Sequence, residues 1–572
     1  MPPDPSDRRP ENETLDSWKA IAAYMQRQVR TVQRWERSEG LPVRRHQHQK
    51  QATVYAFKDE LDAWREAREH QVANESRRIT SKAWISVIVV SVVLGLGLSV
   101  YFTSVQTTTE NERPLIVVLP FAELSAEPML QLADGLTEEL STQLAVADPA
   151  NLAVIARSSA MSFKGREVSA DEIRQELDVD YLVEGSIRRD GDDVRVVVRL
   201  VETVGQIQRW AATYDYNTQP WLSLQDKATA DIVRDLNRVL GLAAPKEPWV
   251  TARDAEALEH VLLGYRYFDQ FGPDTLPEAI EHFSAAVDID NTLVRAHVGL
   301  AVSYCAQAFF GAIPVRQGHA EADKWAASAL ALDALNADAL GVQGWVQFVY
   351  KWEWNDAENL FQQAIALSPN SPWPHWFYAN YLSALDRPDE AIELITAAHR
   401  LDPVSQYTNI ALGYILTNAD MPDDAIQHLT RVSQRTKSRS ARQFLRFAYE
   451  ATGDFGGAVR ILEELGQSDA PAVRQAFDED GEMGYWRALR KGHDARAERI
   501  PDLFSWRRAV VLTKLGEFDK AIEELEKGYH QRNGAMVYLQ IYPLDPLYSD
   551  SRFQELLRRM AFPDQQLNPL SH

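Results

Sequence analysis

Residues 389–403 read DEAIELITAAHRLDP, and this stretch has counterparts on both sides of it. A small residue, followed in most copies by an apolar one, recurs at intervals of 34, 34 and 33 residues. The positions are Ala357, Ala391-Ile392, Ala425-Ile426 and Ala458-Val459. Ala279 and Ala521 hold the matching position in PEAIEHFSAAVDIDN and FDKAIEELEKGY. Each copy is therefore expected to open the second helix of a repeated two-helix unit.

A period near 34, a small residue where two helices approach closely and a proline after the second helix are typical of tetratricopeptide repeats. Residues 255–562 resemble this family, and we expect six to eight units, with 468–500 the least regular. Such units bury their apolar faces only by stacking on one another. The resemblance implies an all-α solenoid, wound as a right-handed superhelix, whose concave face takes a peptide or protein partner. Residues 563–572 are expected to form a tail.

The repeat region is rich in aromatic residues. We expect most of them to fill the cores of the helix pairs, with some available to line the concave groove: Trp345, Trp352, Trp354, Trp373, Trp376, Phe377 and Tyr378. Cys305 lies in an apolar stretch and is expected in the core. The scattered His260, His282 and His399 form no recognisable ligand set, and no phosphate loop or serine elbow occurs. We therefore expect no catalytic residue, no cofactor and no metal, and hence no enzyme.

Charge is divided unevenly along the chain. Its 572 residues hold 60 Lys and Arg against 82 Asp and Glu, a formal net charge of -22. Residues 1–82 hold 16 basic and 13 acidic side chains, a net of +3, and residues 83–102 hold none. The remainder carries 44 basic and 69 acidic side chains, a net of -25. A mildly basic head and an acidic body are thus separated by an uncharged stretch.

That uncharged stretch reads AWISVIVVSVVLGLGLSVYF. A helix of this length, at about 1.5 Å rise per residue, spans about 30 Å, the thickness of a bilayer's hydrocarbon core. The preceding linker, residues 71–82, holds the basic Arg77, Arg78 and Lys82, and such flanks favour the cytoplasmic side. We therefore predict one transmembrane helix in a bacterial inner membrane, with a cytoplasmic N-terminus and a periplasmic or otherwise extracytoplasmic C-terminal region. The alternatives are a buried core helix and a cleavable signal peptide.

The head follows a tail of residues 1–14 and shows two helical patterns. The first carries Trp18, Ile21, Ala22 and Met25 at helical spacing. The second is expected over 29–38, where one face collects Arg30, Gln33, Arg34 and Arg37 while Val32 and Trp35 point the other way. Guanidinium groups reach guanine edges or phosphates and glutamine can address adenine, so this face is suited to DNA. The alternative is a solvated helix surface.

A basic segment follows the second helical pattern and precedes a strand-like run and a helix from Lys58. Its cationic side chains could lie along a phosphate backbone, as a wing does: Arg44, Arg45, His46, His48 and Lys50. The spacing of His46 and His48 could also bring two imidazoles to one metal, which is the alternative for that pair.

The stretch SWKAIAAYMQRQVRTVQRWERSEGLPV, with VYAFKDELDAW after it, resembles the winged helix-turn-helix domains of the MerR and excisionase type over residues 15–70. The resemblance implies that the second helix and the wing contact duplex DNA, through Arg30, Thr31, Gln33, Arg34, Arg37, Arg44, Arg45, His46 and Lys50. No dimerising coiled coil follows residue 70. The self-association that paired half-sites require must therefore come from elsewhere in the chain.

Strand and helix signals alternate after the uncharged stretch. RPLIVVLPF and LAVIAR read as short buried strands. LADGLTEELSTQLA reads as a helix capped by Asp134, with Glu138 and Glu139 in its first turn. Ser169 and Glu172 form a capping box for a further helix. Acidic residues at a helix start usually serve capping, so we expect no catalytic or metal cluster there.

Residues 113–242 resemble the TolB-like N-terminal domain in the segments VVLPFAELSAEP, ADGLTEELSTQL, VIARSSAMSFKG, LDVDYLVEGSIRR and QRWAATYD. Asp190-Gly191 is expected to form the turn of a hairpin, and a last helix is expected over 224–240. The resemblance implies a compact α/β fold and a place in the cell envelope. It implies no catalysis.

This order of domains resembles that of membrane-anchored one-component transcriptional regulators. We predict that the cytoplasmic head binds DNA and that the extracytoplasmic region senses or binds a partner. The alternative is an envelope scaffold for protein–protein interaction without specific DNA binding. A nucleotide cyclase, suggested only by labels within the family, is a third interpretation.

Overall fold

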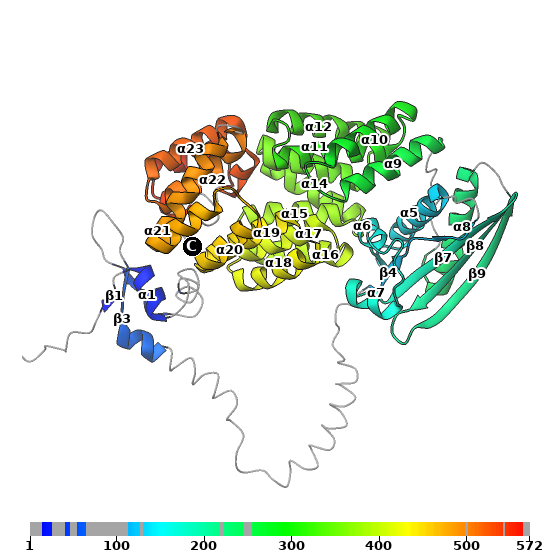
Figure 1. Ribbon diagram of the computed structural model, residues 1–572, viewed down its shortest axis with the longest axis horizontal. Coiled ribbons are helices and arrows are strands. Elements are labelled where there is room, and N and C mark those ends of the chain that lie inside the picture. Colours follow the sequence, from blue (N-terminus) through cyan, green and yellow to red (C-terminus); the bar gives the residue numbers. More distant parts are fainter. Residues whose placement is uncertain are drawn as a thin grey trace, which may run out of the picture. The chain divides into compact units, whose positions relative to one another are not determined.

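The fold is that of a computed structural model (Figure 1). The structure describes residues 14–15, 17–25, 32, 41–45, 54–64, 113–125, 130–217, 221–243, 254–436, 438–497, 501–540 and 544–563. The chain divides into two compact units, Met1–Asn111 and Glu112–His572.

The first unit holds a small antiparallel sheet. β1 (Thr14–Leu15), β2 (Arg44–Arg45) and β3 (Val54–Phe57) pair in the order β1-β3-β2. α1 (Trp18–Met25) and the helical residues 58–64 belong to the same unit. They share a core of buried side chains: Ile21, Ala22, Met25, Val32, Leu41, Val54, Ala56 and Leu61. The helical spacing of the apolar residues before Met25 is therefore confirmed.

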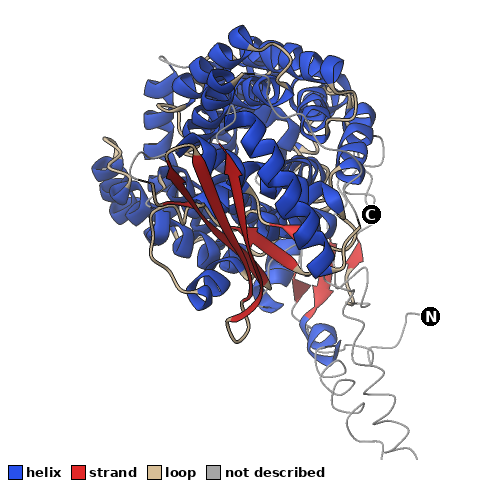
Figure 2. Ribbon diagram, turned by 90° about the vertical axis from the view of Figure 1, so that its right-hand side faces the viewer, coloured by secondary structure: helices blue, strands red, loops and turns tan. Residues whose placement is uncertain are grey.

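The second unit begins with a six-stranded mixed sheet. Its strands are β4 (Leu115–Val118), β5 (Ala122–Glu123), β6 (Ala153–Val154), β7 (Tyr181–Asp190), β8 (Asp193–Glu202) and β9 (Ile207–Asn217). The order is β6-β4-β7-β8-β9, with β5 pairing with β7. β4 runs parallel to β6 and β7, whereas β7, β8 and β9 form an antiparallel meander, seen as the long red strands of Figure 2. All four residues of β4 are buried, as both faces of a covered strand must be.

Four helices cover this sheet, and we call sheet and helices together the α/β layer. α5 (Leu130–Ala147) and α8 (Trp221–Leu240) share one apolar core with strand residues such as Ile116 and Val196. α6 (Arg157–Met161) and α7 (Ala170–Leu177) share another with Leu115, Val117 and Leu182. The alternating residues of β4 thus divide between two cores.

The expected hairpin and capping box are both present in the α/β layer. Asp190 pairs with Asp193 across the turn, and Gly191 has a φ of +62°, which glycine adopts without strain. The amide of Glu172 donates to Oγ of Ser169 at 3.3 Å, and the amide of Ser169 donates to Oε2 of Glu172 at 2.7 Å. Both short-range signals were therefore correct.

The expected cap at Asp134 was wrong. α5 begins at Leu130, so Asp134 lies inside the helix, where its carboxylate meets Nζ of Lys164 at 2.6 Å. Glu138 and Glu139 consequently lie beyond the first turn, and both are buried. Burial of Leu132, Ala133 and Leu136 extends the helix toward its N-terminus and outweighs the capping preference of an aspartate.

From Ala255 onward the unit is helical (Figures 1 and 2). The helices are α9 (Ala255–Phe268), α10 (Leu276–Ile289), α11 (Val294–Phe310), α12 (Val315–Leu332), α13 (Ala337–Val346), α14 (Trp354–Leu367), α15 (Pro372–Ala384), α16 (Pro388–Leu401), α17 (Gln406–Asn418), α18 (Pro422–Thr436), α19 (Arg439–Thr452), α20 (Phe455–Glu464), α21 (Ala470–Ala497), α22 (Pro501–Lys514), α23 (Phe518–Gln531) and α24 (Ser551–Arg559). Shorter helical segments are the π-helix η1 (Gln347–Lys351) and the 3-10 helices η2 (Gly534–Tyr538) and η3 (Asp545–Leu547). α21 contains two helices joined at Asp480 and Gly481, whose backbone is not helical.

The recurring small residues lie where helices meet. All six are fully buried: Ala279, Ala357, Ala391, Ala425, Ala458 and Ala521. Glycines on the preceding helices serve the same close approach, since a Cβ on Gly344 would lie 2.6 Å from the ring of Phe361. Among the clustered aromatics, Trp373 and Trp376 are partly exposed and the other five are buried, as is Cys305. The region is therefore a solenoid of stacked helix pairs, as its period predicts.

The predicted membrane helix, residues 83–102, lies outside the described residues. Within the described part of the chain, the structure contains no helix long and apolar enough to cross a membrane.

Candidate functional site

The described part of the predicted DNA interface is the pair of strands β2 and β3. Arg44 lies opposite Tyr55, and Arg45 lies opposite Val54. The Arg44 side chain is 52% exposed, and its guanidinium carbon lies 5.2 Å from the centre of the Phe57 ring. Its Nη2 donates to Oε1 of Glu60 at 2.6 Å. The aromatic ring and the carboxylate hold an exposed cation on a strand, where it can meet a phosphate.

The core of the first unit positions this strand. Ile21 of α1, Val54 of β3 and Leu61 of the helical segment are all buried together. Val32 is also fully buried, which confirms that it points inward from the predicted second helix. The hydroxyl of Tyr24 donates to Oδ2 of Asp62 at 2.6 Å and ties α1 to the segment after β3.

The remaining predicted contacts lie outside what the structure describes. These are Arg30, Thr31, Gln33, Arg34, Arg37, His46 and Lys50, together with the side chain of Arg45. The helix-turn-helix itself therefore stays a prediction, and so do the DNA contacts assigned to it.

A second functional candidate, which the sequence did not indicate, is the seam between the α/β layer and the solenoid. Arg157, the first residue of α6, pairs through Nη1 with Oδ2 of Asp269 at 2.5 Å and through Nε with Glu138. Arg295 of α11 pairs with the same Glu138. The Arg157 and Glu138 side chains are 15% and 9% exposed. Two arginines and two carboxylates from both parts thus form one network, which is largely buried at Arg157 and Glu138 and partly exposed at Asp269 and Arg295.

Burial dominates the electrostatics of this network. It raises the pKa of Asp269 to about 6, although the charge of Arg157 pulls the other way. Burial also raises the pKa of Glu139, the neighbour of Glu138. The carboxyls of Asp269 and Glu139 are thus held in surroundings that oppose their ionisation, which the charges of Arg157 and Arg295 respectively offset in part.

The loop after α16 forms the next part of the seam. Asp402 is fully buried and accepts hydrogen bonds from the hydroxyls of Ser158 and Ser159, each at 2.6 Å. The Tyr407 hydroxyl donates to the same carboxylate at 2.7 Å. The amide of Ala156 donates to the carbonyl of Leu401 at 2.8 Å. The start of α6 is therefore joined to the solenoid by backbone and side chains together.

Asn370, in the loop after α14, completes the seam. Its Nδ2 donates to the carbonyl of Ala145 at 2.8 Å and to that of Leu152 at 3.0 Å. Seam partners lie from 112 to 257 residues apart in the chain. No spacing within a single motif could have indicated them.

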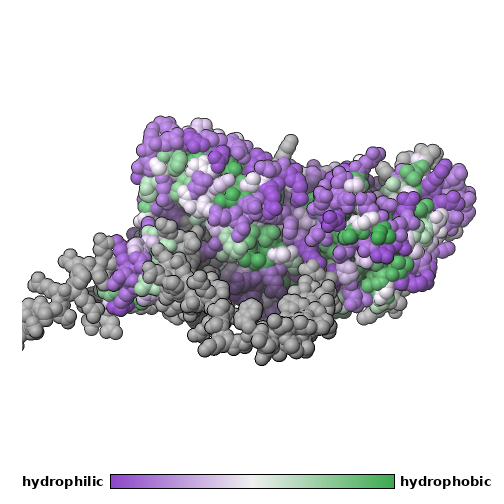
Figure 3. Space-filling view, turned by 90° about the horizontal axis from the view of Figure 1, so that it is seen from below, coloured by the Kyte–Doolittle hydropathy of each residue, from purple (hydrophilic) through white to green (hydrophobic). Residues whose placement is uncertain are grey.

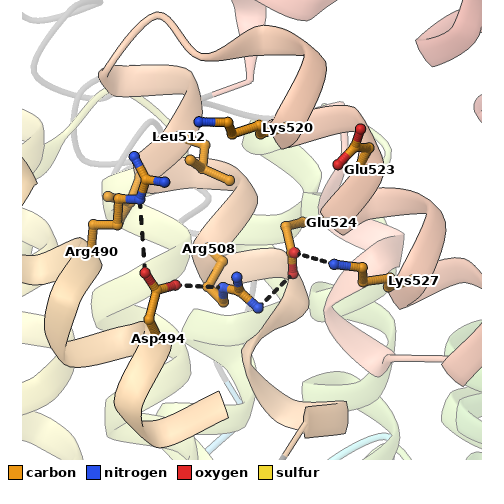
Figure 4. Close-up of a pocket in the computed structure, with 9 residues that line it drawn as sticks. Arg490, Asp494, Arg508, Leu512, Lys520, Glu523, Glu524 and Lys527 are labelled. Atoms are coloured by element: carbon orange, nitrogen blue, oxygen red, sulfur yellow. Dashed lines mark hydrogen bonds and ion pairs between the residues drawn. The ribbon is translucent and has the colours of Figure 1, made fainter. Parts of the chain in front are cut away.

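A cavity of about 190 Å³ lies between α21, α22 and α23 (Figure 4). Its charged side chains are bonded to one another: Arg508 meets Asp494 at 3.0 Å and Glu524 at 3.1 Å, and Lys527 meets Glu524 at 2.6 Å. Sites for small molecules are mostly apolar with a few converging polar groups. A lining of mutually paired charges fits a structural junction better than a ligand site.

The surface of the molecule is mixed rather than uniformly polar. In the view of Figure 3, hydrophobic residues gather in small patches over the second unit, between larger hydrophilic areas. The exposed large apolar side chains of the described residues are scattered along the chain, and they include Leu124, Val204, Phe309 and Leu335. Single exposed apolar residues are normal on soluble surfaces, so they do not mark a binding face.

Comparison with known proteins bears first on the repeats. Residues 353–410 match the family model of the tetratricopeptide repeat, and this range runs from α14 into α17. Residues 353–410 are therefore tetratricopeptide repeats. The 34-residue period, the buried alanines and the paired helices beyond this range have the same character.

Two curated relatives match larger parts of the chain. It is 30% identical over 194 residues to "Putative adenylate cyclase 3" of Rhizobium meliloti, covering 33% of this chain and 32% of that protein. It is 24% identical over 262 residues to the transcriptional regulator HilA of Salmonella typhimurium, covering 45% of this chain and 46% of that protein. The chain thus spans 32% of the length of the first relative and 46% of the length of the second.

Some solved structures are similar to part of this chain. The human IFIT1 dimer with m7Gppp-AAAA has 15% identity, covers 53% of this chain and 77% of its own, and gives a TM-score of 0.35. A TPR protein of Thermus thermophilus has 15% identity. The match covers 34% of this chain and 98% of that chain, with a TM-score of 0.28.

Proposed function

We propose that the chain is a membrane-anchored one-component transcriptional regulator. Residues 15–70 bind duplex DNA in the cytoplasm of a bacterium, and residues 83–102 cross the inner membrane once. The α/β layer, which we take to be TolB-like, and the repeat solenoid lie outside the cytoplasm and bind a peptide, a protein or a small ligand. At least two chains associate for DNA binding, and no chain acts as an enzyme.

The observation that carries the DNA-binding part is the sheet of the first unit. A short N-terminal strand pairs with the second strand of a two-stranded ribbon, and α1 and Val32 share the core. A ribbon of this kind can present exposed cations such as Arg44 to a phosphate backbone, which supports the proposal. The similarity to the transcriptional regulator HilA supports a regulatory role for the chain.

The seam supports the sensing part. A ligand changes a regulator only if it binds two of its states with different affinity. Arg157, Arg295 and Asp402 join the α/β layer to the solenoid. A ligand that shifts the conformation of one part would therefore shift the conformation of the other. Both would then change orientation together relative to the membrane.

The competing proposal is an envelope scaffold without specific DNA binding. The tetratricopeptide match favours it, because such repeats commonly serve protein–protein contact. Genome-wide mapping of DNA bound by the intact protein separates the two. Discrete peaks support the regulator, whereas a profile no different from that of an untagged strain supports the scaffold.

A charge-matched pair of variants tests the interface itself. Arg44→Ala removes an arginine that is 52% exposed and paired with Glu60; Arg199→Ala removes one from β8 that is 54% exposed and paired with Glu184. Fluorescence anisotropy with duplex DNA, using the full chain in detergent over a range of salt, gives the log–log slope. One lost phosphate contact lowers its magnitude by about 0.9. We expect this for Arg44→Ala only; equal slopes for both variants would remove the wing from the interface.

A further inference from the structure

Two arginines from different helices of the solenoid meet at one aromatic ring. The guanidinium carbons of Arg446, on α19, and Arg507, on α22, lie 4.5 Å and 4.9 Å from the centre of the Phe447 ring. Both groups also reach Gln443. With its amide oriented so that the oxygen faces the guanidinium groups, that oxygen accepts from Nε and Nη2 of Arg446 at 3.3 and 2.7 Å and from Nη1 of Arg507 at 3.2 Å. Two cations are therefore held together by a neutral ring and a neutral amide.

Negative charge at this point is scarce. Glu450 pairs with Arg446 and also accepts from the hydroxyl of Tyr485. Arg496 is paired with Asp469 at 2.7 Å. Within the described part of the chain, no carboxylate lies within ion-pair distance of Arg507. One carboxylate thus serves two guanidinium groups.

The titration behaviour agrees with an excess of positive charge. Burial and the charge of Arg446 lower the pKa of Arg507 to about 10, and Glu450 offsets only part of this. Burial lowers the pKa of His493, and Arg507 and Arg446 lower it further. Charges removed from solvent are ordinarily paired with an opposite charge, so a partly buried guanidinium such as that of Arg507, with no carboxylate partner, requires an explanation.

We infer that Arg446 and Arg507, with Gln443 and Phe447, form a binding site for a small oxyanion, a phosphate or a carboxylate group, within the solenoid. The planar fork of arginine fits both groups through paired N–H donors. Arg507, Gln443 and Phe447 are partly exposed, so an anion can approach from solvent. The cavity of Figure 4 differs, because every arginine lining it is already paired with a carboxylate.

This site does not depend on the regulator proposal, since its test involves no DNA. The full chain in detergent micelles and chloride buffer is titrated calorimetrically with inorganic phosphate and, separately, with succinate. We expect saturable binding that Arg507→Gln weakens at least about tenfold. The matched control is Arg474→Gln, which removes an exposed arginine paired with Glu463 at 2.8 Å and leaves binding unchanged.

A second variant gives a readout of opposite sign. Gln443→Glu places a carboxylate of nearly the same shape between both guanidinium groups, so it should raise the melting temperature and abolish anion binding. Binding of phosphate alone or succinate alone supports the site and identifies the group it prefers; binding of both supports the oxyanion class. Absence of binding to the wild-type chain at ~10 mM of either probe, or equal effects of Arg507→Gln and Arg474→Gln, overturns the inference.

Discussion

At the scale of single residues, the carboxyl of Asp269 shows how burial and pairing compete. Its pKa is raised to about 6 because desolvation outweighs the attraction of Arg157. The folded chain therefore binds this proton more tightly than the unfolded chain does. Its contribution to stability is fully present below a pH of about 4 and is lost as the pH rises through about 6.

Asp269→Asn tests this sign. The amide cannot ionise, so the free energy of unfolding of the variant minus that of the wild type should rise by up to about 3 kcal/mol between a pH of about 4 and about 7. Urea unfolding of the full chain at several pH values measures it. A difference that stays level or falls would place the carboxylate in stabilising surroundings instead.

Asp215→Asn is the control, since the hydrogen bond from Arg195 lowers the pKa of Asp215. A carboxyl with a lowered pKa stabilises the folded chain above its unfolded pKa and loses that contribution as the pH falls. The difference between this variant and the wild type should therefore fall with increasing pH only below a pH of about 4, and it should stay level between about 4 and 7. A rise for Asp269→Asn between a pH of about 4 and about 7, with a level difference for Asp215→Asn over the same range, would show that burial and pairing act as assigned.

At the scale of elements, two helices of a pair approach each other so closely at some positions that only glycine fits there. Gly413, on α17, is buried, and a Cβ there would lie 2.4 Å from the Leu429 side chain of α18. Gly456, near the start of α20, has only Oδ1 of Asp454 nearby, at 3.5 Å. The two glycines therefore serve different ends, and only the first is required by packing.

Replacing each with alanine should move stability in opposite directions. Gly413→Ala overpacks the contact with Leu429 and should lower the free energy of unfolding by about 1–3 kcal/mol. Gly456→Ala loses only chain freedom in the unfolded state and should raise it by about 0.4–1 kcal/mol. Urea midpoints of the full-length variants compare them. A neutral Gly413→Ala would mean that α17 and α18 can separate at little cost.

Elements were predictable where the signal is local or periodic. The recurrence of Ala357, Ala391 and Ala425 predicted the solenoid, and Ser169 with Glu172 predicted a helix start. The strand β9 was not predicted, because its assignment rests on pairing with β8 and on tyrosines that reach across to α8. The hydroxyls of Tyr214 and Tyr216 donate to Asp235 and Asp231 at 2.8 and 3.1 Å. Because these contacts join residues that are distant in the sequence, a short stretch of sequence does not reveal them.

The candidate sites also differ in whether the sequence could predict them. The exposed position of Arg44 could be predicted, because a basic segment before a strand suits a surface ribbon. The pair of Arg446 and Arg507 could not, since 61 residues separate the two positions and neither belongs to a recognisable motif. Only the path of the solenoid brings these side chains of α19 and α22 to one ring.

At the scale of the whole molecule, the seam makes the α/β layer and the solenoid one mechanical body. Leu401 of the solenoid lies within the apolar core that β4, α6 and α7 share. Arg157 stands between two carboxylates, one from each part. Removing one partner of a buried ionic network leaves the others uncompensated, at a cost of about 3–5 kcal/mol. The seam should therefore decide whether the two parts unfold together.

Arg157→Met tests this coupling. In the wild type we expect β4–β9 and α9–α24 to lose hydrogen-exchange protection in one step, because neither part can leave the seam without exposing buried charge. In the variant, the α/β layer should open at lower denaturant than the solenoid. Arg166→Met is the matched control, because Arg166 is 42% exposed and its pairing with Glu176 at 2.7 Å lies within the α/β layer. Exposed pairs contribute at most about 1 kcal/mol, so that variant should still open in one step. Separate opening of the two parts in the wild type would show that the seam holds them in contact without coupling their stability. Binding of a ligand to the solenoid could then not change the conformation of the α/β layer through the seam.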